Sequence, residues 1–191
     1  MILCDKTLKK CVEEKKINFT PPLTETQIQP SSIDLRLDYV FTTYNQEEIG
    51  TIDTGNRRLD LSNYSSTKRL KYNTDPYILQ PSSFVLAQTL EHVSVPTDMV
   101  GVVEGRSSFG RVGLLIHVTA GYIDPGFEGN ITLEIGNINN IPIAIYPEQR
   151  ICQIVFHELD DKCEFQYGHP MRNSKYQFQR NPMPSKINME R

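Results

Sequence analysis

The sequence has 191 residues, of which 38% are hydrophobic and 23% are charged. This length suits one domain with its own core, and the ordinary composition excludes a disordered, collagenous or coiled-coil chain. The chain has 20 Lys and Arg residues and 23 Asp and Glu residues, so its net charge is −3. This charge argues against a nucleic-acid-binding surface. There is no apolar run of membrane-spanning length and no signal-peptide pattern. We therefore expect a cytoplasmic chain without nucleic-acid or membrane partners.

The four cysteines are spaced too irregularly for a metal site. Cys4, Cys11, Cys152 and Cys163 form no C-x-x-C pair, so no zinc site is predicted. With no secretory leader expected, a disulfide framework is not expected either. We expect reduced and mostly buried thiols.

The first predicted element is a helix over residues 5–16. Asp5 is its expected cap, and Leu8, Cys11 and Val12 lie on one face at helical spacing. Helical periodicity nearly disappears after this segment, so the rest of the chain is expected to be mainly strands and loops.

Short strand-like segments separated by prolines and glycines follow the helix. Residues 31–44 alternate or are rich in β-forming residues, whereas residues 45–76 are polar and are expected to form a long connection or surface lobe. Further strands are predicted at residues 84–95, 99–105, 129–137, 142–147 and 150–159. This spacing favours an antiparallel sandwich or barrel. The polar tail over residues 162–191 is expected to be frayed, or ordered by a ligand or a neighbouring subunit.

Two polar segments are candidates for chemistry. In residues 29–37, Asp34 and Arg36 share one strand face; the alternative is a solvated face with a cross-strand ion pair. In residues 104–113, arginines and serines stand at a predicted helix start that Ser107 or Ser108 would cap. Such a start could cradle a phosphate, or it could be an ordinary capped turn.

A third candidate is the strand that contains Glu134. Ile131, Leu133 and Ile135 are predicted to lie on one face, with Thr132 and Glu134 on the other. A carboxylate in such an apolar strand is exposed, paired, or desolvated with a raised pKa that suits general acid–base chemistry.

Taken together and in this order, the segments resemble the dCTP deaminase family of the dUTPase-like superfamily. The matching strings are MILCDKTLKK, QPSSIDLRL, EGRSSFGRVGLLIHVTAGYIDPGFEGNITLEIGN, PIAIYP with RICQIVF, and SKYQFQRNPMPS. The resemblance implies a single dUTPase-like domain over residues 1–191. Its fold would be mainly β, a distorted antiparallel barrel with a short N-terminal helix and few other short helices. Three copies would form a homotrimer with active sites at the subunit interfaces, closed by the tail.

The resemblance also implies a zinc-independent hydrolytic deamination of dCTP. Glu134 is implied as the general base, Ser107 and Arg111 as the groups that position the water and the carboxylate, and Ala120 as a small residue beside the pyrimidine. Asp124 is implied to activate a phosphate-attacking water in dUMP-forming members. The implied substrate-binding residues are Arg106, Ser108, His117, Val118, Tyr122, Ile123, Tyr167, Lys175 and Gln179. Mg²⁺ is implied only as a bridge between substrate phosphates, and dTTP as a feedback inhibitor in the family.

The product is left open between two enzymes. The main expectation is dUTP and ammonia; the alternative is a bifunctional enzyme that gives dUMP, pyrophosphate and ammonia, as the string AGYIDPGF suggests. A plain dUTPase is less favoured, because the tail lacks a glycine-rich arm carrying a Phe. A non-catalytic nucleotide-binding trimer is also less favoured, because Glu134 is present.

Overall fold

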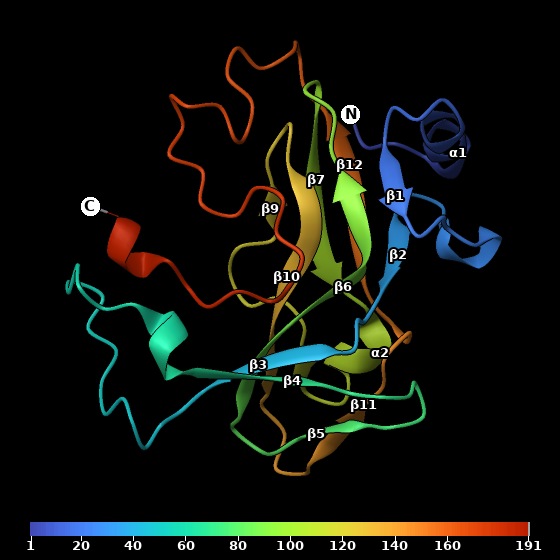
Figure 1. Ribbon diagram of the computed structural model, residues 1–191. Helices are drawn as coiled ribbons and strands as arrows, with labels where there is room; N and C mark the ends of the chain where they lie inside the picture. The colour runs from blue at the N-terminus through green and yellow to red at the C-terminus, as the bar shows by residue number, and fades with distance from the viewer. Residues whose placement is uncertain (191) are drawn as a thin grey trace.

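Strands dominate the computed structural model, which describes residues 1–190 (Figure 1). The α-helices are α1 (Asp5–Glu13) and α2 (Ser107–Gly110), and the 3-10 helices are η1 (Glu25–Gln27), η2 (Leu61–Tyr64) and η3 (Ile187–Met189). The strands are β1 (Asn18–Thr20), β2 (Ile33–Arg36), β3 (Val40–Tyr44), β4 (Ser65–Arg69), β5 (Tyr77–Leu79), β6 (Phe84–Ser94), β7 (Met99–Gly105), β8 (Leu114–Leu115), β9 (Tyr122–Ile123), β10 (Glu128–Asn137), β11 (Ile143–Ile145) and β12 (Arg150–Glu158). The expected mainly β class is confirmed.

The strands form three antiparallel sheets. The largest has the order β4-β3-β6-β10-β8, with β1 paired to β6; a second has the order β2-β12-β7-β9, and β11 pairs with β5. Within residues 1–190 the edge strands of each sheet do not pair with each other, so the hydrogen bonds do not close the expected barrel.

The central strand β10 carries the alternation that the sequence predicts. Ile131, Leu133 and Ile135 are almost fully buried in the core, while Thr132 and Glu134 are partly exposed on the opposite face. Because β6 pairs along most of its length, β10 is held rigidly, and Glu134 lies opposite Leu86. The strand therefore fixes the backbone beneath Glu134.

The first helix is shorter than expected. It ends at Glu13 because Lys15 adopts a left-handed conformation with φ 57°, which terminates a helix. Cys4, rather than Asp5, occupies the cap position and makes no side-chain cap bond. Leu8 and Cys11 are buried, as their spacing predicts.

The region over residues 45–76 is more ordered than its composition suggests. It contains η2 and β4, and β4 pairs along its whole length with β3. Its polar side chains face outward while its backbone completes the sheet. The pairing partner, which composition does not reveal, overrides the local preference for loop.

The tail is ordered by the chain itself. The Phe178 N–H donates to the Glu128 carbonyl at 2.7 Å, and the Asn130 N–H donates to the Gln179 carbonyl at 2.9 Å. These bonds lay the tail along β10, and Gln179 is buried there. In residues 162–190 the tail is therefore packed against the chain's own strands and is not frayed.

Candidate active site

A cavity of about 740 Å³ opens on the outer face of β10 and β6. The loop before β9 and the β9–β10 turn form one wall, and the tail and the lobe that follows β3 form the opposite wall. Figure 1 shows η3 and η2 on the same side of the molecule, and residues of both line the cavity. Segments far apart in the sequence thus enclose one space next to Glu134.

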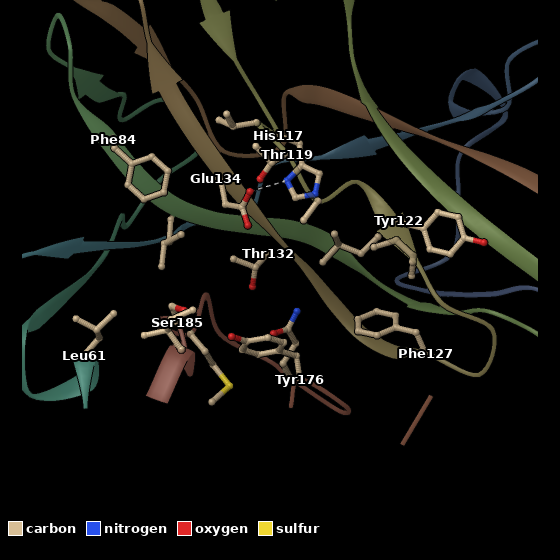
Figure 2. Close-up of a pocket in the computed structure, with 18 of the residues that line it drawn as sticks. Leu61, Phe84, His117, Thr119, Tyr122, Phe127, Thr132, Glu134, Tyr176 and Ser185 are labelled. Carbon is tan, nitrogen blue, oxygen red and sulfur yellow. Dashed lines mark ion pairs between the residues drawn. The ribbon is translucent and has the colours of Figure 1, made fainter. Parts of the chain in front are cut away.

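Glu134 meets His117 at the cavity wall. Its Oε2 atom lies 3.4 Å from His117 Nδ1, and the side chains are 31% and 5% exposed respectively (Figure 2). Among the alternatives that the sequence left open, Glu134 is therefore both partly exposed and paired. A carboxylate held beside an imidazole is well placed to accept a proton and to return it.

Several polar atoms around Glu134 lack hydrogen-bond partners. His117 Nε2 and the Thr132 hydroxyl oxygen are buried without a hydrogen-bond partner in residues 1–190, and His117 Nδ1 has only the 3.4 Å approach of Glu134 Oε2. Both residues line the cavity. Because buried polar atoms are costly when unpaired, these atoms are free to bind a water molecule or a polar ligand in the cavity.

Asp124 adds a second carboxylate to the cavity wall. It begins the turn between β9 and β10, in which the Phe127 N–H donates to the Asp124 carbonyl at 3.1 Å and Gly126 has φ 83°. Only glycine adopts this conformation readily. Partial desolvation by the neighbouring cavity residues raises the pKa of Asp124 above its ordinary value.

The tail closes the cavity through a chain of hydrogen bonds. The Tyr167 N–H donates to the Pro125 carbonyl at 2.8 Å, and the Tyr176 N–H donates to the Tyr167 hydroxyl at 3.1 Å. Gln179 Nε2 donates to the Asn130 carbonyl at 2.7 Å. Burial raises the pKa of Tyr167, so its phenol remains neutral.

The structure brings most of the predicted site residues together. Those that line the cavity are His117, Val118, Ala120, Tyr122, Ile123, Asp124, Glu134, Tyr167 and Gln179. Those that do not line it are Arg106, Ser107, Ser108, Arg111 and Lys175. Cavity residues that the sequence reasoning missed include Tyr44, Ile52, Leu61, Phe84 and Met183. These residues belong to no motif, so no pattern in the sequence predicts that they line a cavity.

Four of the five predicted residues that do not line the cavity lie in the polar segment over residues 104–113. Helix α2 is a single turn with Arg106, not Ser107 or Ser108, at its cap position, so its dipole is small. Ser107, Ser108 and Arg111 are exposed. The fifth residue, Lys175, forms an ion pair with Glu190 in the tail.

Asp34 and Arg36 do not share a solvated strand face, contrary to one sequence alternative. Asp34 is only 2% exposed and pairs with Arg106 and Arg150. Arg36 pairs instead with the fully buried Glu91. The residues of the QPSSIDLRL string thus belong to two separate buried ion-pair groups.

The described residues provide no metal site of their own. Residues 1–190 contain no group of three His, Cys, Asp or Glu side chains that could hold an ion. All four cysteines are free, with Cys11 and Cys152 buried.

None of the helices in residues 1–190 is both long and apolar enough to cross a membrane.

Solved structures define the class of fold. The 2'-deoxycytidine 5'-triphosphate deaminase of Agrobacterium tumefaciens matches with a TM-score of 0.62 and 21% identity, over 81% of this chain and 46% of that chain. The dUTPase of EIAV matches with a TM-score of 0.50 and 18% identity, over 81% and 98% of the two chains. The fold is therefore the one that dCTP deaminases and dUTPases share.

Sequence comparison identifies the family within this class. A family model described as dCTP deaminase-like matches residues 2–159. Curated relatives from Methanobrevibacter smithii and Methanosphaera stadtmanae are 47% and 50% identical, over 99% and 97% of this chain and 96% and 93% of theirs. The chain belongs to the dCTP deaminase-like family, and the expectation of an enzyme of this class is confirmed. Both relatives are named "dCTP deaminase, dUMP-forming", which favours the alternative product over the expected dUTP.

Proposed function

We propose that the protein converts dCTP to dUMP, pyrophosphate and ammonia. The observation that carries the proposal is the Glu134 carboxylate beside His117 on the wall of the cavity. This chemistry is what a zinc-independent deaminase needs, because a carboxylate must activate the attacking water. The near full-length similarity to relatives named for this reaction supports the same assignment.

In the proposed deamination, the pyrimidine lies against the β9–β10 side of the cavity. Glu134 takes a proton from a water molecule as the water oxygen attacks C4 of the cytosine. Glu134 passes this proton to ring N3, then carries the proton of the new C4 hydroxyl to the amino group as the C4–N bond breaks, which leaves the C4 carbonyl and releases ammonia. His117, next to Glu134, stabilises the carboxylate in the orientation that accepts the proton.

In the proposed second step, a water molecule attacks the α-phosphorus. The bond between the α-phosphorus and the bridging oxygen breaks, which releases dUMP and pyrophosphate. Asp124 takes the proton of this water, since it is the second carboxylate of the cavity wall. The two steps together consume two waters for each dCTP.

The triphosphate is proposed to reach the polar segment of a neighbouring subunit. Arg106, Ser108 and Arg111 do not line the cavity of their own chain, so a homotrimer would supply them to a neighbour's cavity. Ser107 would come with them, while Lys175 would act from the tail. Mg²⁺, when bound, would neutralise charge on the phosphate oxygens, with those oxygens as its ligands. Because dTTP shares the triphosphate and the deoxyribose, it would compete for this site in a cytoplasmic enzyme.

Product analysis tests the proposed function. Purified protein is incubated with dCTP and Mg²⁺, and nucleotides are separated while pyrophosphate and ammonia are measured. Equal amounts of dUMP, pyrophosphate and ammonia are expected, without free dUTP. Accumulation of dUTP would support the simpler deaminase, and absence of ammonia would overturn the deaminase assignment. Turnover of dUTP without turnover of dCTP would identify a plain dUTPase.

A further inference from the structure

A buried carboxylate joins two arginines at the edge of the polar segment. Asp34 Oδ2 lies 3.4 Å from Arg106 Nη2 and 3.2 Å from Arg150 Nη1. The two arginines come from the end of β7 and the start of β12, and Arg106 Nη1 also donates to the Arg150 carbonyl at 2.9 Å. Asp34 is 2% exposed, whereas the arginine side chains are 33% and 37% exposed. The guanidinium groups are thus anchored from inside and remain accessible from outside.

The charges around this group do not cancel. The neighbouring Arg36 has its own partner, the buried Glu91, which accepts from Arg36 Nε at 2.6 Å and from its N–H at 2.8 Å. Asp34 is therefore shared between Arg106 and Arg150 alone. Its single negative charge balances only one of the two positive charges of these arginines. An anion with several oxygens, such as a triphosphate, is the natural ligand of such a pair.

The position of Asp34 is fixed by its strand. Asp34 lies opposite Gln153 of β12, and the Gln27 side chain donates to the Asp34 carbonyl at 2.9 Å. Burying a carboxylate is a poor way to gain stability, because desolvation offsets most of the attraction. Consistent with this cost, desolvation raises the pKa of Asp34 although both arginines act in the opposite direction. The group is better explained by the geometry that it imposes.

We propose that Asp34 is a positioning residue that holds Arg106 and Arg150 side by side as a receptor for the substrate triphosphate. The proposal rests on the proposed function and adds Arg150 as a second phosphate-binding arginine. Because both guanidinium groups are held before the substrate arrives, less side-chain entropy is lost on binding.

Asp34→Asn tests this role, because asparagine keeps the shape of the side chain and removes its charge. We expect the KM for dCTP to rise about tenfold with kcat within about twofold, as loss of uniform binding requires. Deamination of dCMP, which lacks the outer phosphates, is expected to change little. Glu91→Gln is the comparison variant: it removes the charge of a buried carboxylate that accepts from Arg36 and from the Gln27 side chain but does not contact Arg106 or Arg150, and it should leave both KM values unchanged. Melting temperatures of the two variants are measured alongside.

The outcomes separate this role from a structural one. An unchanged KM for dCTP in folded Asp34→Asn, or an equal rise for dCTP and dCMP, would overturn the proposal. If Asp34→Asn does not fold, Arg150→Gln replaces it, with the same selective rise in the KM for dCTP expected. If the wild-type protein does not deaminate dCTP, the proposed function fails by itself. In that case calorimetry with inorganic tripolyphosphate tests the phosphate receptor separately from catalysis. Weaker binding by Asp34→Asn than by the wild type supports the receptor, and equal binding refutes it.

Discussion

Glu134 acquires its setting from a simple property of strands. Residues two apart on β10 point the same way, so the apolar neighbours that bury one face leave Glu134 on the other, against the cavity. Replacing it by glutamine keeps the size and removes the base. We expect Glu134→Gln to lower kcat for deamination about a thousandfold, within the range for general bases, while the Kd for dCTP changes little. Single-turnover rates and equilibrium binding measure the two effects.

Glu128→Gln provides the control on the same strand. Glu128 lies outside the cavity lining, and its Oε1 atom is 3.9 Å from His92 Nε2. The same carboxylate-to-amide change there should leave deamination intact. Appreciable turnover by Glu134→Gln would show that another group is the base.

The role proposed for Asp124 would give the proposed second step its own pH dependence. Desolvation raises the pKa of this carboxyl, and a general base works only in its ionised form. Pyrophosphate release should therefore fall as the pH drops through the raised pKa, above the ordinary value of about 4. Asp124→Asn should release ammonia but accumulate dUTP. Both products are followed from pH 4.5 to 8.

Asp98→Asn is the comparison for that experiment. Asp98 lies outside the cavity lining and pairs with Lys16 at 2.8 Å, so its loss should not alter the ratio of dUMP to dUTP. Continued dUMP formation by Asp124→Asn would remove Asp124 from the second step.

At the scale of elements, the sequence predicts the strands better than the segments that cover them. The strands over 84–95, 99–105 and 129–137 are found within one residue of their expected bounds, because alternation and turn residues are local signals. β4 and the tail were missed as ordered elements. Their order comes from backbone hydrogen bonds to distant strands, which no local pattern encodes.

The same reasoning explains which site residues could be predicted from the sequence. Glu134 stands out as a charge in an apolar strand, and Asp124 as the start of a turn. Ile52 and Leu61 do not stand out, because they enter the cavity only through the path of the lobe. The burial of Asp34 was equally hidden, since its arginine partners lie about 70 and 116 residues away in sequence.

The tail is the element whose removal should affect binding most selectively. Truncation before Ser174 removes Tyr176, Gln179 and Met183 from the cavity wall. We expect the KM for dCTP to rise about tenfold or more, because the substrate loses its cover. Melting should shift by only a few degrees, since the tail adds few core side chains. Steady-state kinetics with dCTP and thermal melting test the two expectations.

Gly129→Ala is a milder version of the same test. A Cβ there would lie 3.1 Å from the Gln179 carbonyl oxygen, 3.1 Å from Phe127 Cζ and 3.2 Å from the Gln179 backbone nitrogen, so it should displace the tail and the Phe127 ring without shortening the chain. Its KM should fall between those of the wild type and the truncation. A collapse of the melting temperature on truncation would instead make the tail part of the fold.

At the scale of the whole molecule, one chain holds the two halves of the proposed site apart. Glu134 lies in the cavity, whereas Arg111 is exposed on a segment outside it. The sequence places both residues in one motif but does not indicate whether their side chains meet. We propose that Arg111 of one copy completes the cavity of the next.

Subunit complementation tests this arrangement directly. Glu134→Gln and Arg111→Ala are each expected to be inactive alone. In a cyclic trimer assembled from equal amounts of both, a site is intact when its cavity comes from Arg111→Ala and its polar segment from Glu134→Gln. Random assembly gives this combination in about one quarter of all sites, and in about one third of the sites of the mixed trimers. Co-expression with two different tags, followed by two-step purification, isolates the mixed oligomers, and their dCTP turnover is compared with that of the wild type. Restored activity places the two residues on different copies, whereas inactive mixed oligomers require both residues in one chain's site.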